Sequence, residues 1–255
     1  MKTIKLSLLL ATLLAAAGAH AQKAGDTIVG VGWAFVRPDA SLGPASASGS
    51  STTIPFAPYT GYTSAQVFTG ALTGATANVD NASTPTISVL HMFTNDIGAE
   101  LSLGVPPKLT INMAAPNNTA EPVVNAAATA KALTPAVVAK YFFMEPNSEF
   151  RPYLGLGITR ASFSSVTPRT SSTTVGELAG ISATMSSSWA PVYNAGLIYN
   201  INDKWSINGS VSYMPLKSDV VFVGPGLGNG LGNVTTTTKL TLNPTDYVIR
   251  LGYKF

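Results

Sequence analysis

Residues 246–255 read Asp-Tyr-Val-Ile-Arg-Leu-Gly-Tyr-Lys-Phe and end the chain. Tyr247, Ile249, Leu251, Tyr253 and Phe255 occupy every second position, and the residues between them are polar or small, apart from Val248. A period of two places alternate side chains on opposite faces of a β-strand. The stretch therefore predicts a strand with one continuous apolar face. Such a strand fits a membrane β-barrel, and the alternative is an amphipathic strand of a soluble sandwich.

Seven other segments alternate in the same way, and each is about ten residues long, the length that a tilted strand needs to cross a bilayer. These segments are Thr27–Arg37, Thr86–Phe93, Ile97–Gly104, Ala136–Phe143, Phe150–Phe163, Trp189–Tyr199 and Trp205–Tyr213. Three connections are short (94–96, 144–149 and 200–204) and four are long (about 38–85, 105–135, 164–187 and 215–243), in strict alternation. An even number of strands with short turns on one side is typical of outer-membrane barrels. We predict an all-β fold, an eight-stranded antiparallel transmembrane β-barrel with short periplasmic turns, long extracellular loops and both termini periplasmic.

The composition excludes two other classes of protein. Only 11% of the 255 residues are charged, against about 25% in soluble domains. Mean hydropathy is +0.25. After residue 21 no apolar run approaches the roughly 20 residues of a membrane-spanning helix, and 23 glycines with 17 prolines do not suit a helical bundle. A helical membrane protein is therefore excluded, and an ordinary soluble domain is disfavoured.

Residues 1–21 have the pattern of a cleavable secretory signal peptide. Lys2 and Lys5 precede an apolar stretch at 6–18, and Ala19-His20-Ala21 supplies the small residues of a cleavage site. The apolar stretch is too short for a membrane anchor. Residues 22–255 would then form a single domain with 13 basic and 12 acidic residues. This near-neutral chain gives no electrostatic support for a nucleic-acid partner, and an exported chain without cysteine has no disulfide framework.

The long connections are expected to be irregular loops, with no second hydrophobic core. A small hairpin near Ala65–Thr73 stays open as an alternative. Residues 121–133 are alanine-rich, which favours a short helix, and an ordered loop with one or two helical turns is preferred. The glycine-rich run at 224–232 lacks the spacing and the following helix of a nucleotide-binding loop, so we interpret it as a flexible loop.

A polar network is predicted inside the barrel. An eight-stranded barrel is just wide enough to be filled by its own side chains or to hold one small ligand, so a water-filled channel is not expected. The inward candidates are Glu100, Lys140, Arg151, Tyr153, Asn194, Asn208, Asp246 and Arg250. Two acids and three bases can compensate one another, as buried charges must. A structural plug of ion pairs is favoured over the alternative, a conduction path for ions.

Several stretches resemble the OmpW family of outer-membrane β-barrel proteins (OmpW/AlkL-like). They are 24–39, Phe93-Thr94-Asn95-Asp96-Ile97-Gly98-Ala99-Glu100-Leu101, Phe150-Arg151-Pro152-Tyr153-Leu154-Gly155-Leu156-Gly157, 205–213 and 250–255. The first long connection is longer than expected for the family. The terminal Tyr253 and Phe255 resemble the signal by which barrels are recognised for assembly, which implies the barrel-assembly machinery as a partner. Outer-membrane lipid and lipopolysaccharide of a Gram-negative bacterium are the other expected surroundings.

The resemblance implies passage of small hydrophobic molecules across the outer membrane, with release sideways between strands into the bilayer. Candidate pocket residues near the outer end are Val36, Phe56, Trp189 and Met214, although a tryptophan at a strand end also suits the interfacial girdle. Pro152 and Pro191 could mark a gap between strands, because proline donates no ladder bond. Pro38, Pro215 and Pro106-Pro107 lie at outer strand ends. For all of these prolines the alternative is simple strand termination. The alternative function is a passive structural or surface-recognition barrel with a plugged lumen.

An enzymatic function is not predicted. Downstream of residue 21 the single histidine is His91, and no Gly-x-Ser-x-Gly motif, carboxylate pair or metal-ligand cluster appears. No catalytic, cofactor or metal site is therefore expected.

Overall fold

The computed structural model describes residues 22–51, 66–72, 76–114, 123–168, 171–172, 176–177, 182–225 and 233–255. Every regular element in these ranges is a β-strand. No helix among them is long and apolar enough to cross a membrane. The predicted signal peptide at 1–21, Phe56 and most of the glycine-rich run lie outside the described residues.

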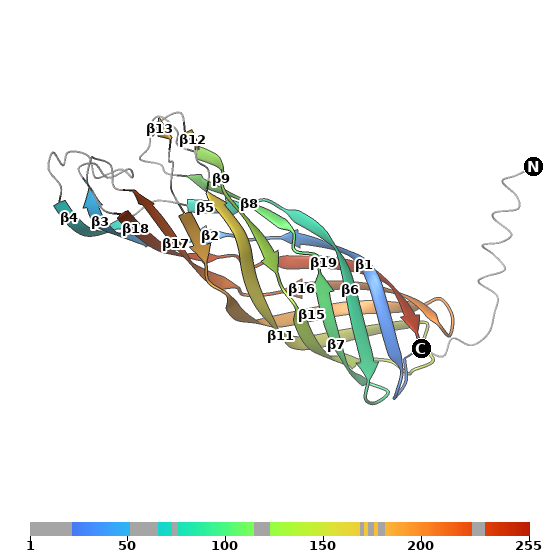
Figure 1. Cartoon of the computed structure of the whole chain (residues 1–255). Helices are drawn as coiled ribbons and strands as arrows, with labels where there is room; N and C mark the ends of the chain where they lie inside the picture. The colour runs from blue at the N-terminus through green and yellow to red at the C-terminus, as the bar shows by residue number, and fades with distance from the viewer. Residues whose placement is uncertain are drawn as a thin grey trace, which may run out of the picture.

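Eight strands close into an antiparallel barrel, as the alternation predicted. They are β1 (Thr27–Arg37), β6 (Ala82–Met92), β7 (Ile97–Gly104), β10 (Ala136–Phe142), β11 (Phe150–Pro168), β15 (Ser188–Asn200), β16 (Trp205–Tyr213) and β19 (Thr245–Lys254). Each pairs with the next one around the ring, and the pairing of β1 with β19 closes it. The short connections and Phe255 lie at one end, which we call the turn end; the long connections extend the opposite end, the hairpin end (Figure 1).

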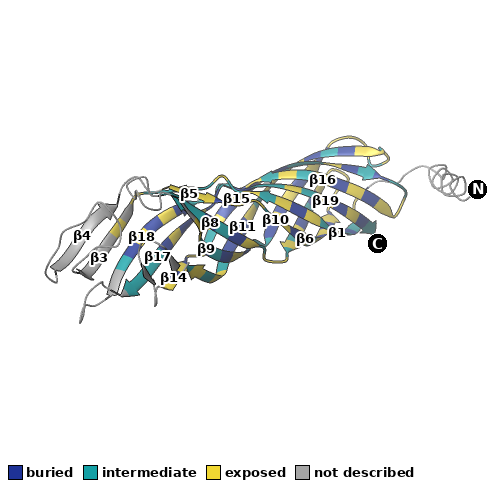
Figure 2. Cartoon of the chain, turned by 90° about the horizontal axis from the view of Figure 1, so that it is seen from above, coloured by how far each residue is buried: buried dark blue, intermediate teal, exposed yellow. Residues whose placement is uncertain are grey.

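The predicted facing of the strands is confirmed by the burial pattern. Leu101 is 53% exposed and its neighbour Glu100 is 5% exposed. Buried and exposed residues alternate along the barrel strands (Figure 2), and the exposed ones include Val31, Leu154, Leu156 and Ile249, which form an apolar band on the outside. Apolar residues facing outward between polar rows are what a bilayer requires of a barrel.

The long connections are mostly strands, and here the prediction of irregular loops is wrong. The additional strands are β2 (Ser41–Leu42), β3 (Ala45–Ser51), β4 (Gln66–Leu72), β5 (Thr76–Val79), β8 (Lys108–Ala114), β9 (Val123–Leu133), β12 (Ser171–Ser172), β13 (Gly176–Glu177), β14 (Ser182–Met185), β17 (Lys217–Pro225) and β18 (Asn233–Thr241). One sheet continues from the end of β11 through β9 and β8 to β5, and another runs β14-β17-β18-β3-β4. The hairpin suggested near Ala65–Thr73 is instead one strand, β4, paired with β3.

Residues 123–133 form β9, neither a helix nor a loop with helical turns. Ala128, Ala130 and Ala132 are at most 8% exposed, and the residues between them are less buried. Pairing with β8 on one side and β11 on the other provides partners for the backbone hydrogen-bonding groups of β9. This tertiary pairing outweighs the helical preference of alanine, which is a weak prior.

A second core fills the hairpin end, contrary to expectation. Its largest members are Leu109, Ile111, Met185, Leu216, Leu240 and Leu242, and six alanines and two valines, among them Ala161 and Val220, complete the buried set. Small residues at alternate positions, each unremarkable in the sequence, produce this core because two sheets bring them together. The interior of the hairpin end is therefore apolar.

Gly32 in β1 is a position where the wall tolerates no side chain. A Cβ added there would overlap the backbone carbonyl oxygen of Ile249 in β19. In contrast, a Cβ at Gly209 in β16 would meet nothing within 4 Å. We predict that Gly32→Ala lowers the free energy of unfolding in detergent by about 1–3 kcal/mol, as overpacking does. Gly209→Ala is the matched control and should leave stability unchanged or slightly raised; equal stability of both variants would contradict the register of β1 against β19.

Neighbouring residues of β6 test the facing of the barrel wall. Ser88 is 5% exposed inside the barrel, and Val89 is 40% exposed on the outer face. In lipid vesicles, a membrane-soluble thiol reagent should modify the Val89→Cys variant and spare Ser88→Cys. Modification of Ser88→Cys with protection of Val89→Cys, measured by mass spectrometry, would reverse the facing.

Candidate ligand cavity

The turn end of the lumen is closed by apolar side chains. Ile28, Leu90, Met92, Phe142, Tyr153 and Ile198 form a buried cluster there. Arg151 lies below it with no exposed surface, and its guanidinium donates to the backbone carbonyls of Gln22 at 2.6 Å and Asn95 at 2.7 Å. Carbonyl oxygens thus engage the two terminal nitrogens of this buried cation, with Asp96 3.8 Å away, whereas its Nε has no hydrogen-bond partner among the described residues.

A charged cluster spans the lumen next, centred on Glu100. Lys140 Nζ lies 2.7 Å from Oε2 of Glu100, and Arg250 Nη1 lies 3.1 Å from Oε1. The three residues come from β10, β7 and β19 and are at most 7% exposed. Lys140 Nζ also lies 4.3 Å from the ring centroid of Tyr153, whose hydroxyl donates to Asn208 at 2.9 Å. Three of the five predicted inward charges therefore meet, and they obstruct a straight path along the barrel axis.

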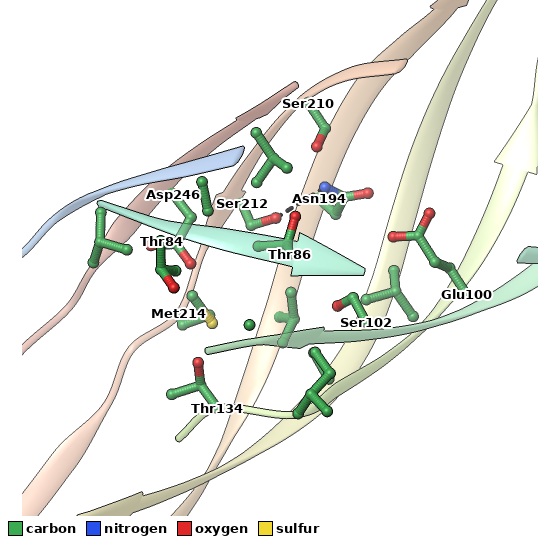
Figure 3. A pocket seen from close by; sticks show the side chains of 18 of the residues that line it. Thr84, Thr86, Glu100, Ser102, Thr134, Asn194, Ser210, Ser212, Met214 and Asp246 are labelled. Carbon is green, nitrogen blue, oxygen red and sulfur yellow. Dashed lines mark hydrogen bonds between the residues drawn. The ribbon is translucent and has the colours of Figure 1, made fainter. Parts of the chain in front are cut away.

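A cavity of about 80 Å³ lies between this cluster and the hairpin end. One part of its wall is polar, with Thr84, Thr86, Ser102, Asn194, Ser210, Ser212 and Asp246 (Figure 3). Another part is apolar, with Ala34, Val36, Leu103, Val105, Val138, Val192 and Met214. The cavity is smaller than the roughly 150 Å³ void that binds benzene in a well-studied case, so a larger guest requires lining side chains to move.

The residues proposed from the sequence fall into three groups. Glu100, Asn194, Asp246, Arg250, Val36 and Met214 line the cavity. Lys140 adjoins it through Glu100, whereas Arg151, Tyr153 and Asn208 lie toward the turn end. Trp189 does not line the cavity: it is 65% exposed on the outer face, with the Arg160 guanidinium 5.9 Å from its ring centroid. The buried neighbours Ala190 and Val192 fix the inward parity of β15, and this parity turns Trp189 outward.

The lining of the cavity by small polar residues was not predicted from the sequence. Thr84, Thr86, Ser102, Ser210 and Ser212 share the inward parity of Glu100 and Asn194, and that parity was the available signal. Their short side chains leave the space that larger residues fill closer to the turn end.

The barrel wall has a break in its hydrogen-bonded ladder beside the cavity. Pairing of β7 with β10 ends at Ser102 and Ala136, and pairing of β8 with β9 begins only at Lys108 and Lys131. Between these points Ala132 N donates to Pro107 O at 3.2 Å, whereas Val105 N turns to Pro85 O at 3.1 Å on the other neighbour. Leu103 and Val105 line the cavity and are nevertheless 45% and 60% exposed on the outside. Residues at this break therefore belong both to the cavity lining and to the outer face of the wall.

The gap suggested at Pro152 and Pro191 is not there. Register between β11 and β15 runs without interruption through Pro152 opposite Leu197 and Ile158 opposite Pro191. The prolines that do border a break are Pro106, Pro107 and Pro135.

Comparison with known proteins agrees with this architecture. The profile of the OmpW family matches residues 51–255. The chain is 27% identical to outer membrane protein W of Escherichia coli, with all of both chains covered. It is 24% identical to outer membrane protein AlkL of Ectopseudomonas oleovorans over 73% of this chain and 71% of that protein. The crystal structure of the outer membrane protein OprG from Pseudomonas aeruginosa superposes with a TM-score of 0.70 at 26% identity, covering 93% of this chain and 99% of that one.

The matched segment contains seven of the eight barrel strands, the charged cluster and most of the cavity wall. The chain is accordingly a member of the OmpW family of outer-membrane β-barrel proteins.

Proposed function

We propose that this barrel mediates the passage of small hydrophobic molecules across the outer membrane and releases them sideways into the bilayer. The observation that carries the proposal is the cavity whose lining includes residues at the break in the ladder between residues 103–107 and 132–135. A guest in the cavity has the lipid phase beside it, on the other side of Leu103 and Val105.

The apolar interior of the hairpin end supplies the way in. A smaller cavity of about 20 Å³ lies there, lined by Leu42, Ile111, Met113, Met185, Val220 and Phe222 among others. An apolar molecule loses water contact on entering such a space, which favours entry by about 25 cal/mol per Å² of apolar surface removed from water. In this proposal the hairpin end faces outward from the cell and the turn end faces the periplasm.

Passage straight through the barrel is opposed by two obstacles. The Glu100 cluster would have to separate, and breaking one member from a buried ion pair typically costs about 3–5 kcal/mol. Beyond it the apolar cluster around Phe142 and Tyr153 fills the lumen. Movement of a few side chains at the break in the ladder requires neither change.

A passive structural barrel is the second candidate, and the filled turn end favours it. Its surface partners would be outer-membrane lipid and lipopolysaccharide, with the barrel-assembly machinery engaged at Tyr253 and Phe255. A passive barrel needs no opening in its wall. The two functions therefore differ in whether molecules pass through the break in the ladder.

Thr134 offers a test, because it lines the cavity within the unpaired segment. Thr134→Trp should fill the opening and lower uptake of apolar compounds, such as alkanes or terpenes, to that of cells lacking the protein. The matched control is Ala139→Trp, which lies on the outer face of β10 and should transport normally.

Folding of both variants is checked by the heat-dependent gel shift of a barrel. Equal uptake with and without the wild-type protein across the panel would contradict transport and support the passive barrel. Normal uptake by a folded Thr134→Trp variant would contradict lateral release.

A further inference from the structure

Two hydrogen-bond acceptors in the cavity wall have no donor among the residues that the structure describes. Asn194 is 8% exposed, and its Nδ2 donates to Val211 O at 3.1 Å and Ser212 Oγ at 2.9 Å. A backbone carbonyl can only accept, so the amide nitrogen must point to Val211 and the amide oxygen Oδ1 is left as an acceptor. Among the described residues, neither this oxygen nor the buried Oδ1 of Asp246 has a hydrogen-bond partner.

The two acceptors lie at one level of the barrel. Asn194 pairs with Ser212 across β15 and β16, and Ser212 pairs with Asp246 across β16 and β19. Adjacent strands are about 4.8 Å apart, so the three residues form a short polar arc. Figure 3 shows this arc on the cavity wall, with Thr84 and Thr86 on the facing strand β6.

The cations of the lumen are engaged elsewhere. Both bases of the charged cluster contact Glu100, and Arg250 Nε also donates to Thr86 Oγ1 at 3.4 Å. Asp246 has no ion pair in the described part of the chain. Buried acceptors without donors are costly, and a guest that carries an O–H or N–H group can donate to one of them.

The remainder of the cavity is suited to an apolar tail. Val36 pairs with Asp246 across β1 and β19, and Val192 and Met214 continue the wall toward the apolar hairpin end. A polar head at Asp246 thus leaves the rest of a molecule among aliphatic side chains.

We propose that the cavity is a binding site for apolar molecules that carry one hydrogen-bond-donating head group, an alcohol or an amine, with Asp246 as the principal acceptor. The inference rests on the proposed function, whose substrate class it narrows. A hydrocarbon or an ether satisfies neither Asp246 nor Asn194, and the site discriminates against both by the hydrogen bond they lack.

Binding is tested on the detergent-solubilised chain with three compounds that have the same number of non-hydrogen atoms: 1-octanol, n-nonane and methyl heptyl ether. The measurement is an NMR titration that follows the Asn194 side-chain amide and the backbone amides of Ser212 and Asp246. Octanol should perturb these signals at about tenfold lower concentration than the other two, the effect expected of one additional hydrogen bond.

The Asp246→Leu variant should abolish the preference for octanol, and Asp246→Asn should reduce it, because an amide oxygen is a weaker acceptor than a carboxylate. Asp219→Asn is the matched control, since Asp219 is exposed on β17 and pairs only with Lys239 at 3.5 Å among the described residues. It should bind all three compounds as the wild type does.

Equal affinity of the wild type for the three compounds would overturn the proposal, as would an unchanged octanol preference in a folded Asp246→Leu variant. Either result would mean that water alone satisfies the two acceptors. Failure to bind any of the compounds would overturn it as well. Failure of the proposed function is distinguishable, because octanol can bind in detergent whether or not cells take up apolar compounds.

Discussion

Every backbone N–H and C=O group that faces hydrocarbon must find a partner within the protein, because an unsatisfied group there costs several kcal/mol. A closed ladder of eight strands meets this requirement and leaves no free edge. The break between residues 103–107 and 132–135 is an exception that the chain accommodates. Pro106, Pro107 and Pro135 carry no N–H to satisfy, Val105 N is bonded to Pro85 O, and Pro135 O accepts from Arg160 N at 3.3 Å and from the Thr159 hydroxyl at 2.9 Å.

The position of the break follows from the same constraint. Exposed Val137 and Leu103 mark the apolar band on one side of it, and exposed Lys108 and Lys131 mark the polar side. Such a place at the edge of the band tolerates an interrupted ladder better than the middle of the bilayer would. Inside the barrel, the buried carboxylate of Glu100 is compensated in a similar way, because each of its two oxygens contacts one cation. The lumen is thus blocked along the barrel axis, and the barrel wall is weakest at the break in its ladder.

The barrel was predictable from the sequence because apolar residues recur at every second position of each barrel strand. Leu101 beside Glu100, or Tyr247 beside Asp246, shows which face of the strand points to lipid and which to the lumen, without any long-range information. The network partners of Glu100 were predictable as a set for the same reason, but their pairing was not, because Lys140 and Arg250 come from strands distant in the chain. The hairpin end was missed because Ala128, Ala130 and Ala132 carry a weak pattern that only the pairing of β8, β9 and β11 makes decisive.

Prolines show the same limit. Pro152 and Pro191 stand inside alternating segments, where a proline suggests a gap, yet they fit an unbroken register. Pro106 and Pro107 stand at a strand end, where proline is ordinary, and their role depends on which neighbour receives the bonds of Val105 and Ala132. That choice depends on contacts with β6 and β11, and no local pattern encodes it.

The central claim is that a guest leaves the cavity through the side of the barrel and never passes the Glu100 cluster. The most direct measurement is photo-crosslinking of a diazirine-bearing fatty alcohol to the wild-type protein in lipid vesicles, with the labelled residues mapped by mass spectrometry. The account predicts label at Leu103, Val105, Thr134 and the apolar lining of the hairpin end. Label at Met92, Phe142 and Ile198, beyond the charged cluster, would contradict it.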